Sequence, residues 1–249
     1  MQRELSYESF KNFEKRQSQK VQHGSGVYMF MRTQMGEALN DCKMAIVKRE
    51  HILKQAPGHL KGIAKKEKIF LLESDDEGDW RLESHSTNKT DNCVFVLWFP
   101  TYEVAKNWIL YDKDFSKSNF PQQYGSEVFI VPVMKNPLDD RACPTFLMTE
   151  FPGVRDFKAF AERVEERFER AASRYDGHAN VVFSDRNFHV RGKWVSPNNP
   201  IVIHRFKKPI DAFDFYKDNE VRLLRDSLMQ SGICRGRPRS VIFSLDEFM

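Results

Sequence analysis

The sequence contains no long apolar run and few cysteines. None of its apolar stretches approaches the roughly 18 to 20 residues that a membrane-spanning helix needs, and the charged start MQRELSYESFKNFEKRQSQK lacks the apolar segment of a signal peptide. The four cysteines form no CxxC pair and no cluster with histidine. A chain of 249 residues does not need disulfides to stabilise its core. We therefore expect reduced thiols, no membrane partner and a cytoplasmic location.

The sequence also has little net charge and no common catalytic motif. Its charge of +4 is the balance of 39 basic and 35 acidic residues, which is typical of a solvated surface rather than a nucleic-acid footprint. P-loop, G-x-G-x-x-G and G-x-S-x-G motifs are absent. His178 and His189 have no carboxylate or thiol at ligand spacing, and His204 stands alone in an expected strand. The sequence predicts no metal site and no cofactor.

Phenylalanine is abundant, with 21 residues in a chain that is 41% hydrophobic, so we expect an aromatic-rich core. Residues 1–26 form a charged N-terminal extension. Apolar runs and turn residues then predict the elements of a first unit over 27–133: strands at 27–33, 68–73, 92–99 and 126–133, and helices at 35–56 and 101–111.

The stretch 134–144, MKNPLDDRACP, contains two prolines and several turn formers and is the expected linker. The same order of elements follows it over 145–249. We expect strands at 145–151, within 179–195 with an irregularity, at 200–206 and at 239–248, and helices at 154–177 and 210–218.

A local phrase occurs in both halves. FPTYEVAKNWILYDKDF (99–115) and FKKPIDAFDFYKDNEV (206–221) each follow an apolar strand that ends in phenylalanine. The matched positions are Phe99 with Phe206, Ala105 with Ala212, and Trp108 with Phe215. Matched order, lengths and phrase favour a duplication. The predicted fold class is α+β, with two tandem ferredoxin-like βαββαβ units that pair into an intramolecular α+β barrel.

The first phrase resembles the DUF1330-like members of the dimeric α+β barrel superfamily. In that family a strand ending in Phe runs through P-[ST]-x-E-x-A into a helix and a Tyr-Asp-x-x-[YF] stretch. The matching residues here are Phe99, Pro100, Glu103, Ala105, Tyr111, Asp112 and Phe115. The resemblance implies two sheets that face each other across a pocket. Its wider relatives include cofactor-free monooxygenases, isomerases and haem-handling proteins.

Alternation along the strands predicts which side chains lie between the sheets. If Phe95, Leu97 and Phe99 face the helices, then Val94, Val96 and Trp98 face the open side. The candidate pocket residues are Tyr28, Arg32, Trp98, Glu150 and Arg205. One interpretation is a Glu150–Arg205 ion pair in an apolar core. The other is a pocket in which Arg32 or Arg205 holds an anionic group against Trp98.

Three functions remain open at this point. The favoured one is a non-catalytic or degenerate barrel that binds a protein partner or a small anionic or aromatic ligand, as a monomer with an internal pseudo-dimer. The alternative is a cofactor-free small-molecule enzyme of isomerase or monooxygenase type, with its pocket between the sheets. RNA binding through the basic loop of Arg235, Arg237 and Arg239 is the least favoured, because neither third strand carries the aromatic motif of an RRM.

Overall fold

The computed structural model describes residues 26–35, 59–65, 69–72, 91–111, 127–132, 142–177, 188–191, 194–196 and 198–246. Several predicted features lie outside these residues: the N-terminal extension, the helix at 35–56, the part of the second-half strand at 179–187 and most of the linker. The acidic stretch SDDEGD at 74–79 also lies outside them.

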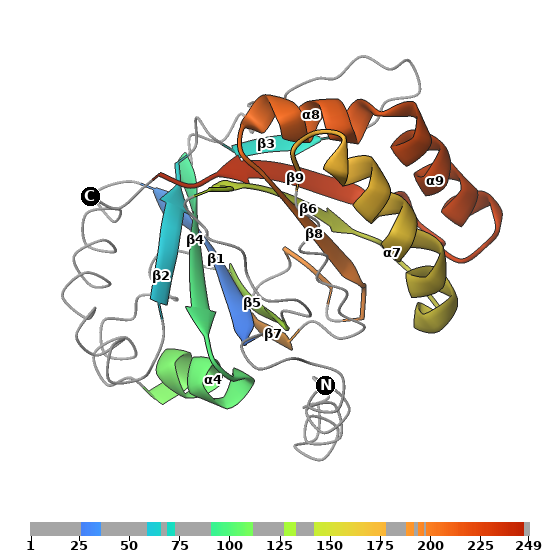
Figure 1. Ribbon diagram of the computed structural model, residues 1–249. Helices are drawn as coiled ribbons and strands as arrows, with labels where there is room; N and C mark the ends of the chain where they lie inside the picture. Colours follow the sequence, from blue (N-terminus) through green and yellow to red (C-terminus); the bar gives the residue numbers. More distant parts are fainter. Residues whose placement is uncertain are drawn as a thin grey trace.

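The described strands form two antiparallel sheets (Figure 1). Sheet A has the order β2-β4-β1-β5-β7. Its members are β1 (Val27–Met35), β2 (His59–Ala64), β4 (Asp91–Phe99), β5 (Glu127–Pro132) and β7 (Phe188–Arg191). The first four, taken in chain order, are arranged 2-3-1-4 across the sheet, which is the ferredoxin-like arrangement.

Sheet B has the order β3-β9-β6-β8. Its members are β3 (Ile69–Leu72), β6 (Thr145–Glu150), β8 (Ile201–Phe206) and β9 (Arg239–Ser244). Within it, β6 lies between β8 and β9, as the first strand of a ferredoxin-like unit does. The fold class is therefore α+β with two facing antiparallel sheets, and the sheets remain two open layers rather than one closed barrel.

The edge strands differ from the expected pairing. The strand expected at 68–73 is β3, which pairs with β9 of sheet B and not with the first sheet. Its expected place beside β4 is taken by β2, whose sequence HLKGIA has too little apolar alternation to be recognised. In return, β7 from the second half pairs with β5 of sheet A. Each half thus contributes one edge strand to the sheet of the other.

Glycine allows β2 to approach sheet B closely. A Cβ atom at Gly62 would lie 2.8 Å from the Cβ of Leu245, closer than carbon atoms approach. The next residue, Ile63, forms an isolated antiparallel bridge with Asp246, just beyond β9. Gly62 therefore lets an edge of sheet A meet the end of sheet B.

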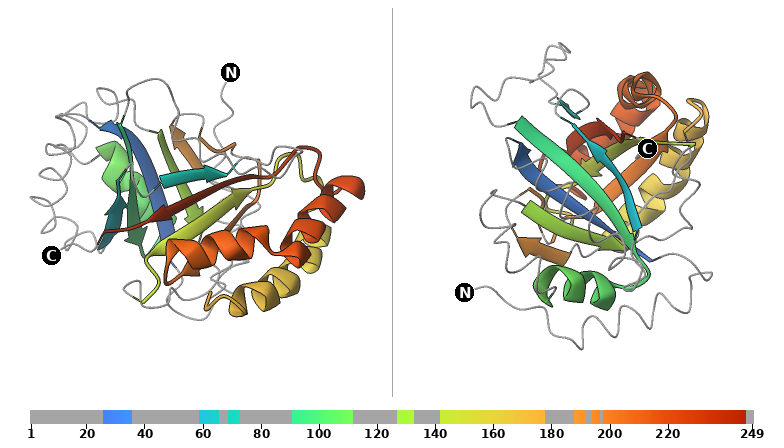
Figure 2. Two further views of the ribbon diagram at one scale, coloured as in Figure 1. Left: turned by 90° about the horizontal axis from the view of Figure 1, so that it is seen from above. Right: turned by 90° about the vertical axis from the view of Figure 1, so that its left-hand side faces the viewer.

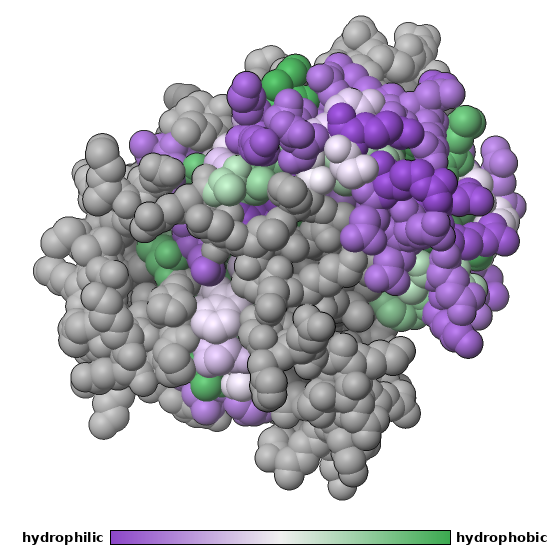
Figure 3. Space-filling view, in the orientation of Figure 1, coloured by the Kyte–Doolittle hydropathy of each residue, from purple (hydrophilic) through white to green (hydrophobic). Residues whose placement is uncertain are grey.

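Helices cover the outer faces of both sheets (Figures 1 and 2). α4 (Tyr102–Tyr111) packs on sheet A, whereas α7 (Phe157–Ser173), α8 (Pro209–Lys217) and α9 (Asn219–Gln230) lie on sheet B. Among the described helices, none has the length and apolar character needed to cross a membrane. The surface over α7, α8 and α9 is mainly hydrophilic (Figure 3). α9 was not predicted, although its buried Val221, Leu224 and Leu228 follow helical spacing.

The predicted orientation of the strands is confirmed. Phe95, Leu97 and Phe99 pack in the cluster beneath α4, while Val94 and Val96 lie in the cluster between the sheets. In sheet B, Phe146 and Met148 face the other sheet, and Leu147 faces the helices. The repeated phrase also occupies equivalent places, because Phe99 and Phe206 end β4 and β8 just before a helix. The duplication itself stays a prediction.

Asp218 joins the helices of sheet B and gives the first testable prediction. Its carboxylate caps α9 by accepting hydrogen bonds from the N–H groups of Glu220 and Val221, and it also accepts from Tyr175 (2.8 Å) and Arg174 (3.0 Å). Burial raises the pKa of Asp218, but the hydrogen bonds from Tyr175 and the backbone and the charge of Arg174 outweigh it, so the pKa lies below 3.8. This carboxylate stabilises the fold above that pH, and the contribution is lost as pH falls through the lowered pKa.

We expect Asp218→Ala to lower the free energy of unfolding at pH 7 by about 1 to 2 kcal/mol, the usual cost of losing a helix cap. Urea denaturation measures the change. Asp218→Asn keeps an oxygen that accepts the cap hydrogen bonds and should lose less. Asp214→Ala, on the exposed face of α8, is the control. Equal stability of Asp218→Ala and the control would contradict the assigned role.

Candidate functional site

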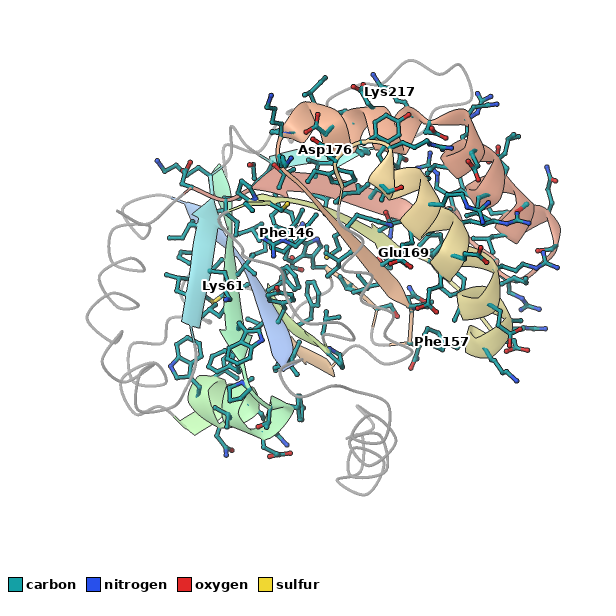
Figure 4. All side chains as sticks on the ribbon, in the orientation of Figure 1. Lys61, Phe146, Phe157, Glu169, Asp176 and Lys217 are labelled. Atoms are coloured by element: carbon teal, nitrogen blue, oxygen red, sulfur yellow. The ribbon has the colours of Figure 1, made fainter. Side chains whose placement is uncertain are left out.

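An aromatic layer fills the space between the two sheets. Tyr28, Phe30 and Phe129 of sheet A face Phe146 and Phe243 of sheet B, and each of these residues is at most 1% exposed. Phe146 is central: its ring stacks on Phe243 at 5.3 Å and meets Tyr28 and Phe30 edge-on at 6.1 and 6.3 Å. Figure 4 shows Phe146 among the side chains that crowd this space. The centre of the intersheet layer is a packed core.

A guanidinium, a carboxylate and an indole meet at one end of this layer. Arg32 of β1 forms an ion pair with Glu127, its cross-strand neighbour on β5. The Arg32 guanidinium lies 5.0 Å from the centre of the Trp194 ring, a cation–π distance. Trp194 in turn packs edge-on against Phe129 at 5.1 Å. The Arg32 and Glu127 side chains are 31% and 19% exposed, so solvent reaches both.

Glu150 lies at the end of β6 and holds the segment that carries Trp194. One carboxylate oxygen accepts hydrogen bonds from the Ser196 N–H at 3.0 Å and from Asn199 Nδ2 at 2.6 Å. The other oxygen accepts from Arg239 at 2.5 Å. The Glu150 side chain is only 5% exposed, so its charge is stabilised by these donors rather than by water.

Trp98 and Arg205 lie toward the other end of the layer. Trp98 is paired with Tyr28 across β4 and β1, and Lys61 lies over its ring at 5.8 Å. Gly26, at φ +55°, lies against Trp98, and a Cβ there would be 2.6 Å from the indole nitrogen. Arg205 is fully buried, donates hydrogen bonds from two of its nitrogens to the Cys143 carbonyl, and lies 4.8 Å over the Phe146 ring.

The predicted site residues therefore share one face without forming one site. The expected Glu150–Arg205 ion pair is wrong: Arg205 lies opposite Phe146 and Glu150 opposite Ile201, about 13 Å apart along the strands. Arg32 and Trp98 are separated by the same offset on β1 and β4, so the expected contact between them is also absent. Arg32 and Glu150 do come together, indirectly, through the Trp194–Ser196 stretch.

Sequence reasoning missed Glu127, Trp194 and Asn199. Glu127 had a readable signal, because it starts the fourth strand and falls on the intersheet side by alternation with Phe129. Trp194 and Asn199 lie outside any regular element, in a bend before β8, so no periodicity places them. Only the packing of that stretch against sheet A reveals their role.

The basic loop is anchored to the backbone that precedes α7. The N–H groups of Arg235 and Gly236 and the thiol of Cys234 all donate to the Pro152 carbonyl, at 3.1, 3.3 and 3.1 Å. Arg239 forms an ion pair with Glu150, while Arg235 and Arg237 are exposed. RNA binding through this loop stays a prediction.

His204 is buried on the helix side of β8 without a hydrogen-bond partner for either ring nitrogen among the described residues. The rings of Phe215, Phe168 and Phe206 lie around it, with centres at 4.7, 5.4 and 6.4 Å. Burial lowers the pKa of His204 to about 3. A haem ligand needs open space beside its nitrogen, and the three rings occupy that space, so these residues do not fit a haem. Within the described ranges, no three or more His, Cys, Asp or Glu side chains form a candidate metal site.

No family model and no curated protein matches the chain, so the DUF1330-like resemblance stays a prediction. Solved structures similar to it include a protein of Fusobacterium nucleatum subsp. nucleatum provisionally named a monooxygenase, with 14% identity over 90% of this chain and 94% of that one and a TM-score of 0.48.

Two further similar structures are a mutant chlorite dismutase from Candidatus Nitrospira defluvii and a dye-decolorizing protein from V. cholerae. The dismutase is 11% identical over 92% of this chain and 94% of its own, with a TM-score of 0.48. The dye-decolorizing protein is 9% identical over 91% and 96%, also with a TM-score of 0.48. Likeness at this level shows nothing about activity.

Proposed function

We propose that the chain is a cofactor-free enzyme that transfers a proton on a small, planar, anionic substrate at the Arg32 end of the intersheet layer. The observation that carries this proposal is the partly exposed Arg32–Glu127 pair beneath Trp194. An aromatic oxo acid is the substrate class that fits a guanidinium, a carboxylate and an indole in contact.

Each side chain has a distinct role in this proposal. Arg32 donates to the substrate carboxylate or to the enolate oxygen that develops during the reaction. Glu127 removes a proton from the carbon next to the carbonyl and returns it to the enolate, so atoms and charges balance. Trp194 stacks on the planar part of the substrate. Because Arg32 has five N–H donors, its pair with Glu127 leaves others for the substrate.

Phenylpyruvate is a suitable probe, because its C3 protons lie next to a carbonyl. In deuterated buffer, proton NMR should show faster exchange of these protons with the protein than without it. We expect Glu127→Gln to slow the catalysed exchange by about 10² to 10⁴-fold, the usual contribution of a general base. Arg32→Gln should weaken phenylpyruvate binding about tenfold, equivalent to roughly 1.4 kcal/mol. Arg163→Gln and Glu165→Gln, on the exposed face of α7, are the charge-matched controls.

A second candidate is a binding protein without catalysis, and the packed aromatic layer favours it. Among the described side chains, Phe30, Phe129 and Phe146 fill the centre of the layer and leave a ligand only its end. Binding of phenylpyruvate that depends on Arg32 but brings no exchange would support this candidate. An unaltered exchange rate in Glu127→Gln would contradict the enzyme proposal, as would the absence of binding by the unmodified protein at millimolar phenylpyruvate.

A further inference from the structure

Trp194 reaches the site on a stretch that has no regular secondary structure of its own. It belongs to the bend at 194–196, which follows β7 and precedes β8. Val195 beside it is 3% exposed and lies in the intersheet cluster. Without the hydrogen bonds of a sheet or helix, the position of the Trp194 ring depends on specific contacts to this short stretch.

Glu150 supplies the most direct of these contacts. Its Oε1 atom accepts from the Ser196 N–H, two residues after Trp194, and from the amide of Asn199. Two further hydrogen bonds fix Asn199. Its side-chain oxygen accepts from the Gly153 N–H at 3.3 Å, and its backbone N–H donates to the Ser196 carbonyl at 3.2 Å. The carboxylate thus connects the rigid end of β6 to the stretch that carries Trp194.

The two oxygens of Glu150 have separate tasks. Oε1 binds the Trp194 stretch, and Oε2 binds Arg239 at the start of β9. The side chain of Arg239 is 61% exposed, so an ion pair on that side is largely accessible to solvent. A substitution of Arg239 therefore removes the contact to Oε2 and leaves the contacts of Oε1 with the Trp194 stretch in place.

We infer that Glu150 is a positioning residue, which holds the Trp194 ring over Arg32 so that the site selects planar aromatic anions over non-planar ones. The inference rests on the proposed function. Glu150 does not reach the Arg32 guanidinium in this arrangement; it acts through Ser196, Asn199 and the backbone between them. The partly buried Trp194 indole offers a flat apolar surface on which an aromatic ring can stack, whereas a saturated ring of similar size is thicker and cannot stack in the same way.

The full chain labelled with 5-fluorotryptophan provides a direct readout. The four tryptophans give separate fluorine resonances, and Trp194→Phe assigns one of them. In Glu150→Ala we expect the Trp194 resonance to move toward the position of solvent-exposed fluorotryptophan, while that of Trp108, on the far side of sheet A, stays in place. Asn199→Ala breaks part of the same connection and serves as the second variant if Glu150→Ala does not fold.

Binding measurements test the selectivity. The unmodified protein should prefer benzoate to cyclohexanecarboxylate, an acid of similar size, and Glu150→Ala should reduce the ratio of the two dissociation constants about tenfold. Glu150→Gln retains an acceptor for Ser196 and Asn199, and Arg239→Gln removes only the exposed partner. Both should keep the Trp194 resonance and the preference, which a general loss of stability would not predict.

The outcomes separate this inference from the proposed function. An unmoved Trp194 resonance together with an unchanged preference in Glu150→Ala would overturn the inference. If the unmodified protein binds neither acid, the proposed function fails, and the selectivity inference fails with it. The fluorine resonances of the unliganded variants then still decide whether Glu150 holds Trp194 in place.

Discussion

Replacing His204 with leucine is expected to stabilise the protein and to remove much of its acid sensitivity between pH 6.5 and about 3. The His204 imidazole is 2% exposed, and its two nitrogens find no partner among the described residues. A buried donor or acceptor left without a partner costs about 1 to 3 kcal/mol. Leucine fills a similar volume without polar atoms, so the free energy of unfolding should rise by about that amount at neutral pH.

The pH dependence follows from the lowered pKa of His204. The unfolded chain binds a proton near pH 6.5, whereas the folded protein binds it only near pH 3, because burial disfavours the charged ring. The free energy of unfolding is therefore unaffected by His204 protonation above pH 6.5, and it decreases as the pH falls toward the pKa of His204 in the folded protein. Each pH unit inside this window removes about 1.4 kcal/mol, which gives a loss of roughly 2 to 3 kcal/mol by about pH 4.5.

Urea denaturation of wild type and His204→Leu at several pH values measures both effects. Phe215→Leu is the matched control, because its ring lies 4.7 Å from His204 and its loss weakens the same cluster at every pH. The control should lower the whole stability profile without flattening it. Equal slopes for His204→Leu and wild type between about pH 6.5 and 4.5 would show that the imidazole does not titrate as the buried geometry requires.

Phe146→Ala is expected to destabilise the protein by about 3 to 5 kcal/mol, the range for removing a buried phenylalanine ring. Phe146 is fully buried and contacts rings of both sheets, so its loss opens a cavity that neither sheet closes alone. This is a large part of the 5 to 15 kcal/mol that holds a typical domain together. Denaturant midpoints measure the change, and Phe146→Leu, expected to lose less, keeps the experiment informative if the alanine variant does not fold.

Phe157→Ala is the control for this prediction, because Phe157 is only half-buried at the start of α7 (Figure 4). A double-mutant cycle between Phe30 and Phe146, whose rings lie 6.3 Å apart, tests the contact between the sheets directly. We expect a coupling energy of at least about 0.5 kcal/mol. A loss no larger than that of Phe157→Ala, with no coupling to Phe30, would show that the sheets do not share a packed layer.

The sequence predicted part of the candidate site, and only the tertiary structure showed the rest. The sequence correctly placed Arg32 and Glu150 on the intersheet face, because alternation within a single strand decides which face a residue occupies. It did not predict the residues that these side chains contact. Arg205 bonds to the Cys143 carbonyl and Glu150 to Asn199, a neighbour 49 positions away, although a direct Glu150–Arg205 pair satisfied the same pattern. Alternation decides which face of the sheet a residue occupies, but not its position along the strand relative to residues on the neighbouring strand.

The sequence by itself determined the α+β fold class, the helices after β4, β6 and β8, and the side of β1, β4, β6 and β8 that each residue faces. These features depend on local periodicity, in which neighbouring residues report on one another. Tertiary structure alone decided that β3 joins sheet B, that β7 joins sheet A and that Trp194 covers Arg32. Edge strands pair through backbone groups that every sequence offers, and the Trp194 stretch is held by contacts between residues distant in the chain, so neither leaves a periodic signal.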